Sequence, residues 1–132
     1  MPELTWKSIA FLALILVLSV GGCSSDLSKA QLAFREGTDL LQQPHLESAI
    51  RAFDKAIQLD PSFSVAYYSR GYAYGELGQH ERAVQDFDKT IQLHPSYAAA
   101  YGNRGYAYGE LGQDAKADAD KAKACSLDSK FC

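Results

Sequence analysis

Apolar residues recur along the second half of the chain with the spacing of an α-helix, and the pattern is written twice. The ten residues 70–79 return letter for letter at 104–113, an offset of 34 residues. The nine residues 53–61 return at the same offset as 87–95, with two changes. Aromatic residues in these phrases stand three or four positions from glycine or alanine, so they share a helix face with them. The pattern predicts a packed helix pair in every 34 residues.

Proline and glycine mark where these helices end. Pro61 and Pro95 close the second phrase in its two copies, and proline cannot continue a helix. Gly78 and Gly112 fall near the end of the first phrase, where glycine suits a sharp turn between two helices. The sequence therefore predicts hairpins of two helices that are separated by proline-containing turns.

In register, the phrases give three units of 34 residues: 30–63, 64–97 and 98–131. Their small, aromatic and proline positions resemble the tetratricopeptide repeat, and this resemblance implies an all-α solenoid of three hairpins in a right-handed superhelical stack. The residues that carry it are Ala33, Gly37, Leu40, Ala49, Phe53, Ala56 and Pro61; then Tyr67, Gly71, Tyr74, Ala83, Phe87, Thr90 and Pro95; then Tyr101, Gly105, Tyr108, Ala117, Lys121, Ala124 and Ser129. The last helix, expected over 114–127, is polar, as suits the end of a stack.

The resemblance also implies a concave groove lined by the first helix of each unit. Carried over position by position, the groove candidates are Gln31, Phe34, Arg35, Thr38, Leu41, Gln42, Val65, Tyr68, Ser69, Tyr72, Gly75, Glu76, Ala99, Gly102, Asn103, Tyr106, Gly109 and Glu110. Tyr68, Tyr72 and Tyr106 are the contact candidates, because tyrosine offers a large apolar surface and a hydrogen-bonding tip. Asn103 is expected to bond a peptide backbone. The alternative is that these tyrosines only pack along the groove wall.

The charges in this groove indicate what kind of peptide it takes. Some tetratricopeptide domains grip an acidic C-terminus with a clamp of lysine and asparagine. The matching positions here are Phe34, Thr38, Ser69, Ala99 and Asn103, and none of them is lysine or arginine. Glu76 and Glu110 stand on the groove wall, so an apolar or mildly basic segment is the expected ligand.

Two arginines occupy positions that should be packed. Arg70 and Arg104 each have an aspartate sixteen residues later, Asp86 and Asp120, which a helix hairpin brings onto the neighbouring helix. An ion pair between the two helices is favoured over a contact with a ligand. Other acids, such as Asp54 and Asp88, are expected on solvated outer faces.

The N-terminal segment indicates export. Residues 8–20 are almost unbroken apolar sequence, too short to cross a hydrocarbon core of about 30 Å and typical of a signal peptide. Residues 20–23, Val-Gly-Gly-Cys, resemble the bacterial lipobox. That resemblance implies cleavage after residue 22 and a lipid-modified Cys23, which two or more acyl chains would anchor stably. The alternative is an uncleaved signal anchor.

The lipobox interpretation divides the N-terminus into a signal peptide over 1–22 and a lipidated cysteine with a short tether over 23–29. Fully extended, the tether would span at most about 20 Å. The folded part is therefore expected close to a membrane in the bacterial cell envelope, at the periplasmic face. The outer membrane is favoured if the source is Gram-negative.

Cys125 and Cys132 allow two interpretations. In an oxidising compartment two nearby thiols usually pair, and such a short loop would contribute about 2–3 kcal/mol in the chain-entropy model. Alternatively, Cys125 is a small buried hydrophobe, since the other units have Ile57 and Ile91 at its position. The disulfide is the favoured interpretation.

The remaining observations favour an interaction module over other classes. A net charge of −3 lacks the basic excess of a nucleic-acid binder. The cysteines and histidines have no metal-site spacing, and no residue stands in the context of an activated nucleophile, so neither cofactor nor catalysis is expected. The sequence predicts a membrane-anchored module that binds a peptide or partner helix in its groove. The alternative is a structural subunit that self-associates through its terminal helix.

Overall fold

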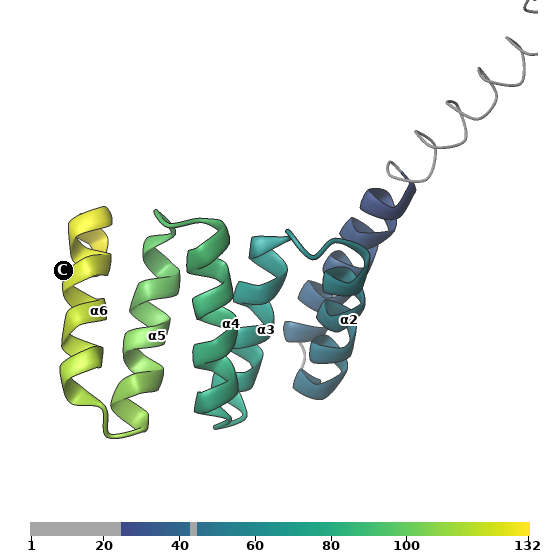
Figure 1. The fold of residues 1–132 in the computed structure, drawn as a ribbon. Coiled ribbons are helices and arrows are strands. Elements are labelled where there is room, and N and C mark those ends of the chain that lie inside the picture. The colour runs from purple at the N-terminus through teal and green to yellow at the C-terminus, as the bar shows by residue number, and fades with distance from the viewer. Residues whose placement is uncertain (1–24, 43–44) are drawn as a thin grey trace, which may run out of the picture.

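The computed structural model of this chain describes residues 25–42 and 45–132. The apolar segment 8–20 and Cys23, with the signal peptide and lipidation site expected there, lie outside these residues. The described part is a row of helices that runs from the helix over 25–41 to α6 (Figure 1). The all-α prediction is confirmed, because the described residues form helices and turns and no strand.

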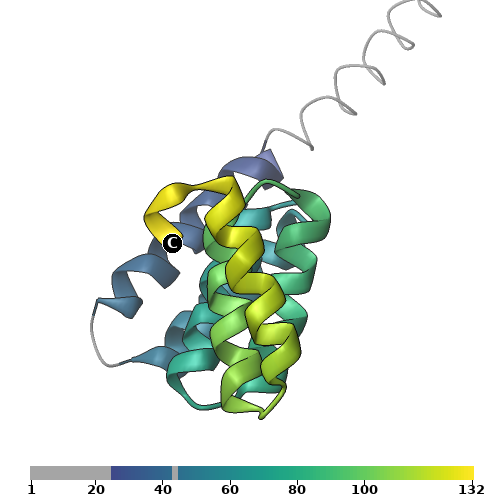
Figure 2. The same ribbon diagram turned by 90° about the vertical axis from the view of Figure 1, so that its left-hand side faces the viewer.

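The helices follow one another in pairs, and the two identical phrases fold alike. The bounds after the helix over 25–41 are α2 Leu46–Leu59, α3 Ser64–Glu76, α4 His80–Leu93, α5 Ala98–Glu110, α6 Asp114–Leu127 and the 3₁₀ helix η1 Ser129–Phe131. The last helix has the ends that the sequence predicted. Figure 2 shows α6 closing one end of the row.

The turn inside each of the last two hairpins depends on a glycine with a positive φ. Gly78 has φ +71° and Gly112 has φ +69°, a region that only glycine adopts without strain. The N–H of Gly78 donates to the carbonyl of Gly75 at 2.9 Å, and the N–H of Gln79 donates to the carbonyl of Tyr74 at 2.8 Å. This pair of bonds is a Schellman motif, which satisfies the last carbonyls of α3. The expected role of these glycines is confirmed.

The two helices of each hairpin approach each other closely at a glycine of the first helix. A Cβ built on Gly37 would lie 2.5 Å from the ring of Phe53, which is fully buried. A Cβ on Gly71 would lie 3.0 Å from the ring of Phe87, and one on Gly105 would lie 3.1 Å from the carbonyl oxygen of Ala117. Because the glycine lets the aromatic ring or the backbone approach this closely, the helices pack with almost no gap.

An arginine in each of the last two hairpins links neighbouring helices. Arg70 donates from Nε and Nη2 to Asp86 at 2.8 and 2.6 Å. Arg104 bonds Asp120 in the same way, at 2.7 and 2.7 Å. The predicted ion pairs between helices are therefore confirmed. The hydrogen bonds to Asp86 raise the pKa of the Arg70 guanidinium, while burial raises the pKa of the Asp86 carboxyl and Arg70 opposes that rise.

Each of these arginines also reaches back to the preceding hairpin. Arg70 Nη1 donates to Asp54 at 2.6 Å, and Arg104 Nη1 donates to Asp88 at 2.6 Å. Asp54 and Asp88 lie on solvent-facing sides as expected, with side chains 40% and 52% exposed, but each is also paired with an arginine, which the sequence did not predict. One guanidinium thus holds three helices, two from its own hairpin and one from the preceding hairpin.

The N-terminal tether predicted over 23–29 is only partly a tether. Residues 25–29 are helical and continue without a break into the helix that ends at 41. A helix advances about 1.5 Å per residue, against about 3.3–3.6 Å for extended chain. The described residues therefore leave less reach between Cys23 and the first hairpin than the sequence suggested.

The C-terminus folds back on the stack beyond the last predicted helix. In η1, which the sequence did not indicate, Phe131 lies 3.5 Å from a Cβ built on Gly102 of α5. Cys125 and Cys132 form a disulfide with their Cα atoms 4.6 Å apart. The bond joins the last turn of α6 to the end of η1 and so holds Phe131 against α5.

Within residues 25–42 and 45–132, no helix is both long enough and apolar enough to cross a bilayer.

We expect Gly37→Ala to destabilise the fold, because the new methyl group has no room beside Phe53. Overpacking of this kind costs about 1–3 kcal/mol. The matched control is Gly75→Ala, since a Cβ there has nothing within 4 Å and should gain about 0.5–1 kcal/mol of helix propensity. Urea unfolding followed by circular dichroism measures both. A Gly37→Ala variant as stable as Gly75→Ala would contradict the proposed crossing.

Removing the Arg70 side chain should leave Asp86, which is 5% exposed, as a buried charge without a partner. Breaking a buried pair in this way costs about 3–5 kcal/mol, whereas Asp54→Asn at the exposed end should cost about 1 kcal/mol or less. Thermal and urea unfolding of Arg70→Ala and Asp54→Asn test the difference. The double variant Arg70→Met/Asp86→Leu should recover much of the loss, and equal effects of the two single variants would refute this role for Arg70.

Candidate peptide groove

A pocket between α3 and α5 unites five of the candidate groove residues. Its lining residues are Tyr72, Gly75 and Glu76 of α3, Ala83 and Phe87 of α4, and Asn103, Tyr106 and Ala107 of α5. The volume is about 80 Å³. The walls come from the first helices of two consecutive hairpins, and the floor comes from Ala83 and Phe87 of α4 together with Ala107 of α5. The repeat places Tyr72, Glu76, Asn103 and Tyr106 together here.

The two tyrosines at this pocket are the exposed ones. Tyr72 is 43% exposed and Tyr106 is 61% exposed, and they hold the same register one repeat apart. Below them, Phe87 is 2% exposed and Ala83 and Ala107 are buried. The pocket therefore has an apolar floor and two aromatic rings at its mouth, a combination that suits a side chain with an apolar body.

Glu76 adds a negative charge to the same wall. It stands one helical turn after Tyr72, and its carboxylate raises the pKa of the Tyr72 hydroxyl above its usual value. Within the described ranges, neither Glu76 nor Glu110 forms an ion pair, unlike the acids held by the two arginines. Glu110 is exposed but does not line this pocket.

Tyr68 follows the alternative that the sequence left open, since it packs along the groove wall and is bonded to Asn103. The amide nitrogen of Asn103 donates to the hydroxyl oxygen of Tyr68 at 2.9 Å. The Tyr68 ring packs against Phe87 and Tyr97, with ring centres 5.8 and 4.9 Å apart, and burial raises its pKa. Tyr68 therefore packs along the groove wall, and Asn103 keeps its carbonyl oxygen and its second amide N–H for a peptide.

The groove candidates of the first hairpin lie apart from this pocket. The ring of Phe34 packs on Phe53 and Phe63 at 5.7 and 5.0 Å, inside the first hairpin. The hydroxyl of Thr38 donates to the carbonyl of Arg35 at 2.8 Å. Neither side chain lines the pocket, whereas the groove candidates Gln31 and Arg35 of the same helix are exposed.

His80 is a neighbour of the pocket that the sequence analysis missed. Its ring stands edge-on to that of Tyr106, with ring centres 6.4 Å apart. Its Nδ1 atom is buried and has no hydrogen-bond partner among the described residues. The other units have Leu46 and Asp114 at this position, so the repeat pattern gave no signal for it.

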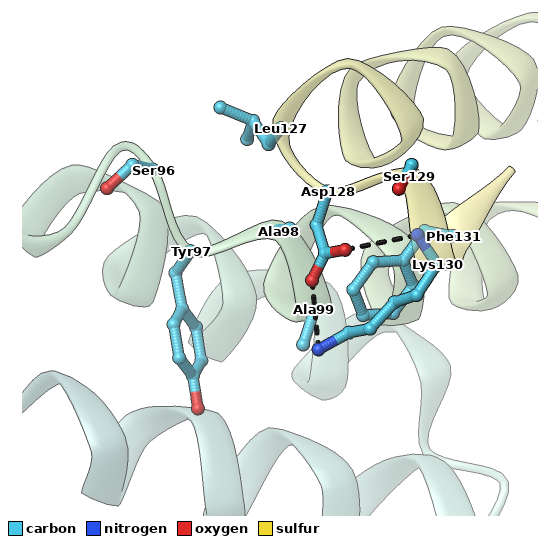
Figure 3. A pocket seen from close by; sticks show the side chains of 9 residues that line it. All are labelled: Ser96, Tyr97, Ala98, Ala99, Leu127, Asp128, Ser129, Lys130 and Phe131. Atoms are coloured by element: carbon cyan, nitrogen blue, oxygen red, sulfur yellow. Dashed lines mark hydrogen bonds and ion pairs between the residues drawn. The ribbon is translucent and has the colours of Figure 1, made fainter.

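A larger hollow, of about 500 Å³, lies at the ends of α5 and α6 (Figure 3). Its lining residues are Ser96, Tyr97, Ala98, Ala99, Leu127, Asp128, Ser129, Lys130 and Phe131. Its two charged groups satisfy each other, since Asp128 accepts from the Lys130 backbone N–H at 3.0 Å and pairs with Lys130 Nζ at 2.9 Å. Because Tyr72 and Tyr106 are not part of it, the small pocket between α3 and α5 is the better candidate site.

The described residues offer no cluster of three or more histidine, cysteine, aspartate or glutamate side chains that could hold a metal ion. The buried acids of α4 and α6 are instead paired with arginine. The pocket between α3 and α5 can bind by aromatic contact, apolar burial and the charge of Glu76.

Models of three tetratricopeptide repeat families match the chain. A TPR repeat model matches residues 37–78, and two tetratricopeptide repeat models match 64–97 and 98–131. The chain belongs to the tetratricopeptide repeat family. Together the matches span residues 37–131, which include the end of the helix over 25–41 and every later described helix.

Solved structures of tetratricopeptide domains share the fold. The first TPR domain of Spaghetti (RPAP3), bound to the HSP90 peptide SRMEEVD, is 27% identical with a TM-score of 0.77, over 78% of this chain and 82% of that one. MamA is 29% identical with a TM-score of 0.74, over 77% of this chain and 60% of that one. The tetratricopeptide solenoid is thus shown by sequence and by structure.

Among curated proteins, a fungal relative matches a shorter stretch. The small glutamine-rich tetratricopeptide repeat-containing protein 2 of Mycosarcoma maydis is 36% identical over 56 residues. That stretch is 42% of this chain and only 16% of the relative. The match therefore reflects the shared repeat.

Proposed function

We propose that this protein is an interaction module that binds an extended peptide or a partner helix in the groove between α3 and α5. The observation that carries the proposal is the pair of exposed tyrosines, Tyr72 and Tyr106, above the apolar floor of one pocket. Tyrosine is enriched where proteins bind one another, because it buries a large area at low entropic cost. The family is a scaffold for such contacts, and the proposal assigns it no catalytic step.

The Spaghetti domain supports a peptide ligand, since it carries one in a similar fold. Its peptide ends in Glu-Glu-Val-Asp. The corresponding clamp positions in this chain, which include Ser69 and Ala99, carry no cation, and Ser69 is 8% exposed. With Glu76 in the pocket, we propose an apolar or mildly basic ligand for this groove in place of an acidic one.

We also propose that the module is held at a membrane by a lipid on Cys23, in the bacterial cell envelope. The support is the apolar segment 8–20 followed by Val-Gly-Gly-Cys. Helical structure from residue 25 onward would keep the first hairpin near the lipid surface. The outer membrane is the proposed address if the source is Gram-negative, and the groove would then meet partners at the periplasmic face.

The double variant Tyr72→Ala/Tyr106→Ala should lose partner capture while keeping its fold. Both side chains are exposed, so removing them costs little stability, but they supply most of the aromatic surface of the pocket. We expect at least about a tenfold loss of captured partner, the size of a modest binding hot spot. Cross-linking and pull-down from intact envelopes, with circular dichroism of both proteins, measures this.

The matched control for this experiment is Tyr101→Ala, because Tyr101 packs over the Arg104 guanidinium and lies outside the pocket. It should keep partner capture. If the double variant captures partners normally while changes in α6 abolish assembly, the groove proposal fails. Self-association through the terminal helix, visible as a dimer in ultracentrifugation, then takes its place.

Cys23→Ser should release the protein from the membrane if a lipid on that residue anchors it. The expected result is loss of the diacylglyceryl mass by mass spectrometry, and transfer of the protein out of the membrane fraction once residues 1–22 are removed, because none of the helices in residues 25–42 and 45–132 is long and apolar enough to span a bilayer. Cys125→Ser/Cys132→Ser is the control and should stay membrane-bound. An unmodified mature wild-type protein would overturn the anchoring proposal.

A further inference from the structure

We propose that the pocket between Tyr72 and Tyr106 is a subsite for one lysine or arginine side chain of the bound peptide. The inference rests on the proposed groove function and names the chemistry that one part of the groove recognises. It follows from three features of the described residues: two aromatic rings at the mouth, an apolar floor and one carboxylate without an ionic partner.

The shape of the pocket fits a long side chain with a charged end. Lysine and arginine bury an apolar stem and keep the charged head near water. The floor residues Ala83, Phe87 and Ala107 are almost fully buried and offer only carbon to the stem. A volume of about 80 Å³ leaves room for a stem and not for a folded segment. Gly75 adds no side chain to the wall, and a Cβ built on it would have no neighbouring atom within 4 Å.

The tyrosine rings suit the charged head. A cation within about 6 Å of an aromatic ring is attracted to its face. The chain already uses this contact inside its hairpins, where Arg70 lies 5.6 Å from the Tyr67 ring and Arg104 lies 5.4 Å from the Tyr101 ring. At the pocket, Tyr72 and Tyr106 present exposed rings with no arginine or lysine over them among the described contacts.

Glu76 supplies the opposite charge. The buried acids of the stack are neutralised by arginines from this chain, as Asp86 is by Arg70. Glu76 has no such partner in the described part of the chain, although it lines a pocket. A carboxylate beside an aromatic mouth gains a charge-assisted hydrogen bond from a ligand cation, which is stronger than a bond between neutral groups.

The register of the repeats explains why the pocket forms between α3 and α5. The positions of Tyr72 and Glu76 hold Thr38 and Gln42 in the first hairpin, so that hairpin has neither the ring nor the charge. Glu110 follows Tyr106 on α5, but the described helices after it are α6 and η1, and neither is the first helix of another hairpin that could form an opposite wall. Within residues 25–42 and 45–132, both walls and the carboxylate meet at this one place.

The test titrates the full chain, kept in mild detergent, with blocked single residues: Nα-acetyl-lysine methylamide and its arginine counterpart. Nα-acetyl-norleucine methylamide is the uncharged control ligand, because its side chain has a similar apolar stem without the cationic head. Amide NMR shifts of Tyr72, Gly75 and Asn103 report the pocket. The cationic ligands should bind at least about tenfold tighter than norleucine at low salt, and added salt should reduce the difference.

Glu76→Gln should remove most of the advantage of the cationic ligands and leave norleucine binding unchanged. Glu81→Gln, which removes an exposed acid of α4 outside the pocket, is the matched control and should keep the full difference. Equal binding of lysine and norleucine overturns this inference, and so does the absence of saturable shifts at the pocket with any of the ligands. If the cation subsite fails this test but Tyr72→Ala/Tyr106→Ala still abolishes partner capture, the groove proposal stands. If that double variant captures partners normally, both proposals fail.

Discussion

The geometry of the groove depends on two guanidinium groups that each hold three helices. Arg70 joins α3 to α4 and to α2 of the preceding hairpin, and Arg104 repeats the arrangement one unit later. Charge-assisted bonds of this kind fix distance and direction together. Because both arginines lie on the helices that wall the groove, the same contacts that join the hairpins also set how far apart Tyr72 and Tyr106 stand.

Much of this fold could be predicted because the chain repeats itself. Two identical phrases must form the same helix and the same glycine turn, and the ends of α6 follow from the register. The contacts between hairpins were harder to foresee. Asp54 precedes Arg70 by sixteen residues, just as Asp86 follows it by sixteen, so the spacing contained the signal for both bonds. Only the bond to Asp86 lies within one hairpin, which is the unit that the repeat register defines.

The site was less predictable than the fold. The repeat register alone treats Tyr68 and Tyr72 as equivalent groove residues. In the structure, the ring of Tyr97 packs on Tyr68 and the Asn103 amide donates to the Tyr68 hydroxyl, while Tyr72 stays exposed. Which tyrosine becomes wall and which becomes surface depends on neighbours that lie about one repeat away. The return of η1 onto Gly102 was hidden for the same reason, since the preceding hairpins have Phe34 and Tyr68 at that position.

The central claim is that partners meet the face between α3 and α5, and site-specific photo-cross-linking tests it most directly. In cells that make the full chain, a benzophenone amino acid would replace either Tyr106, which lines the pocket, or Gln85, which does not. Gln85 is an exposed residue of α4, two residues along the chain from the floor residue Phe87. The account predicts a discrete cross-linked partner at position 106 and none at position 85. Cross-linking at position 85 with none at position 106 would contradict it.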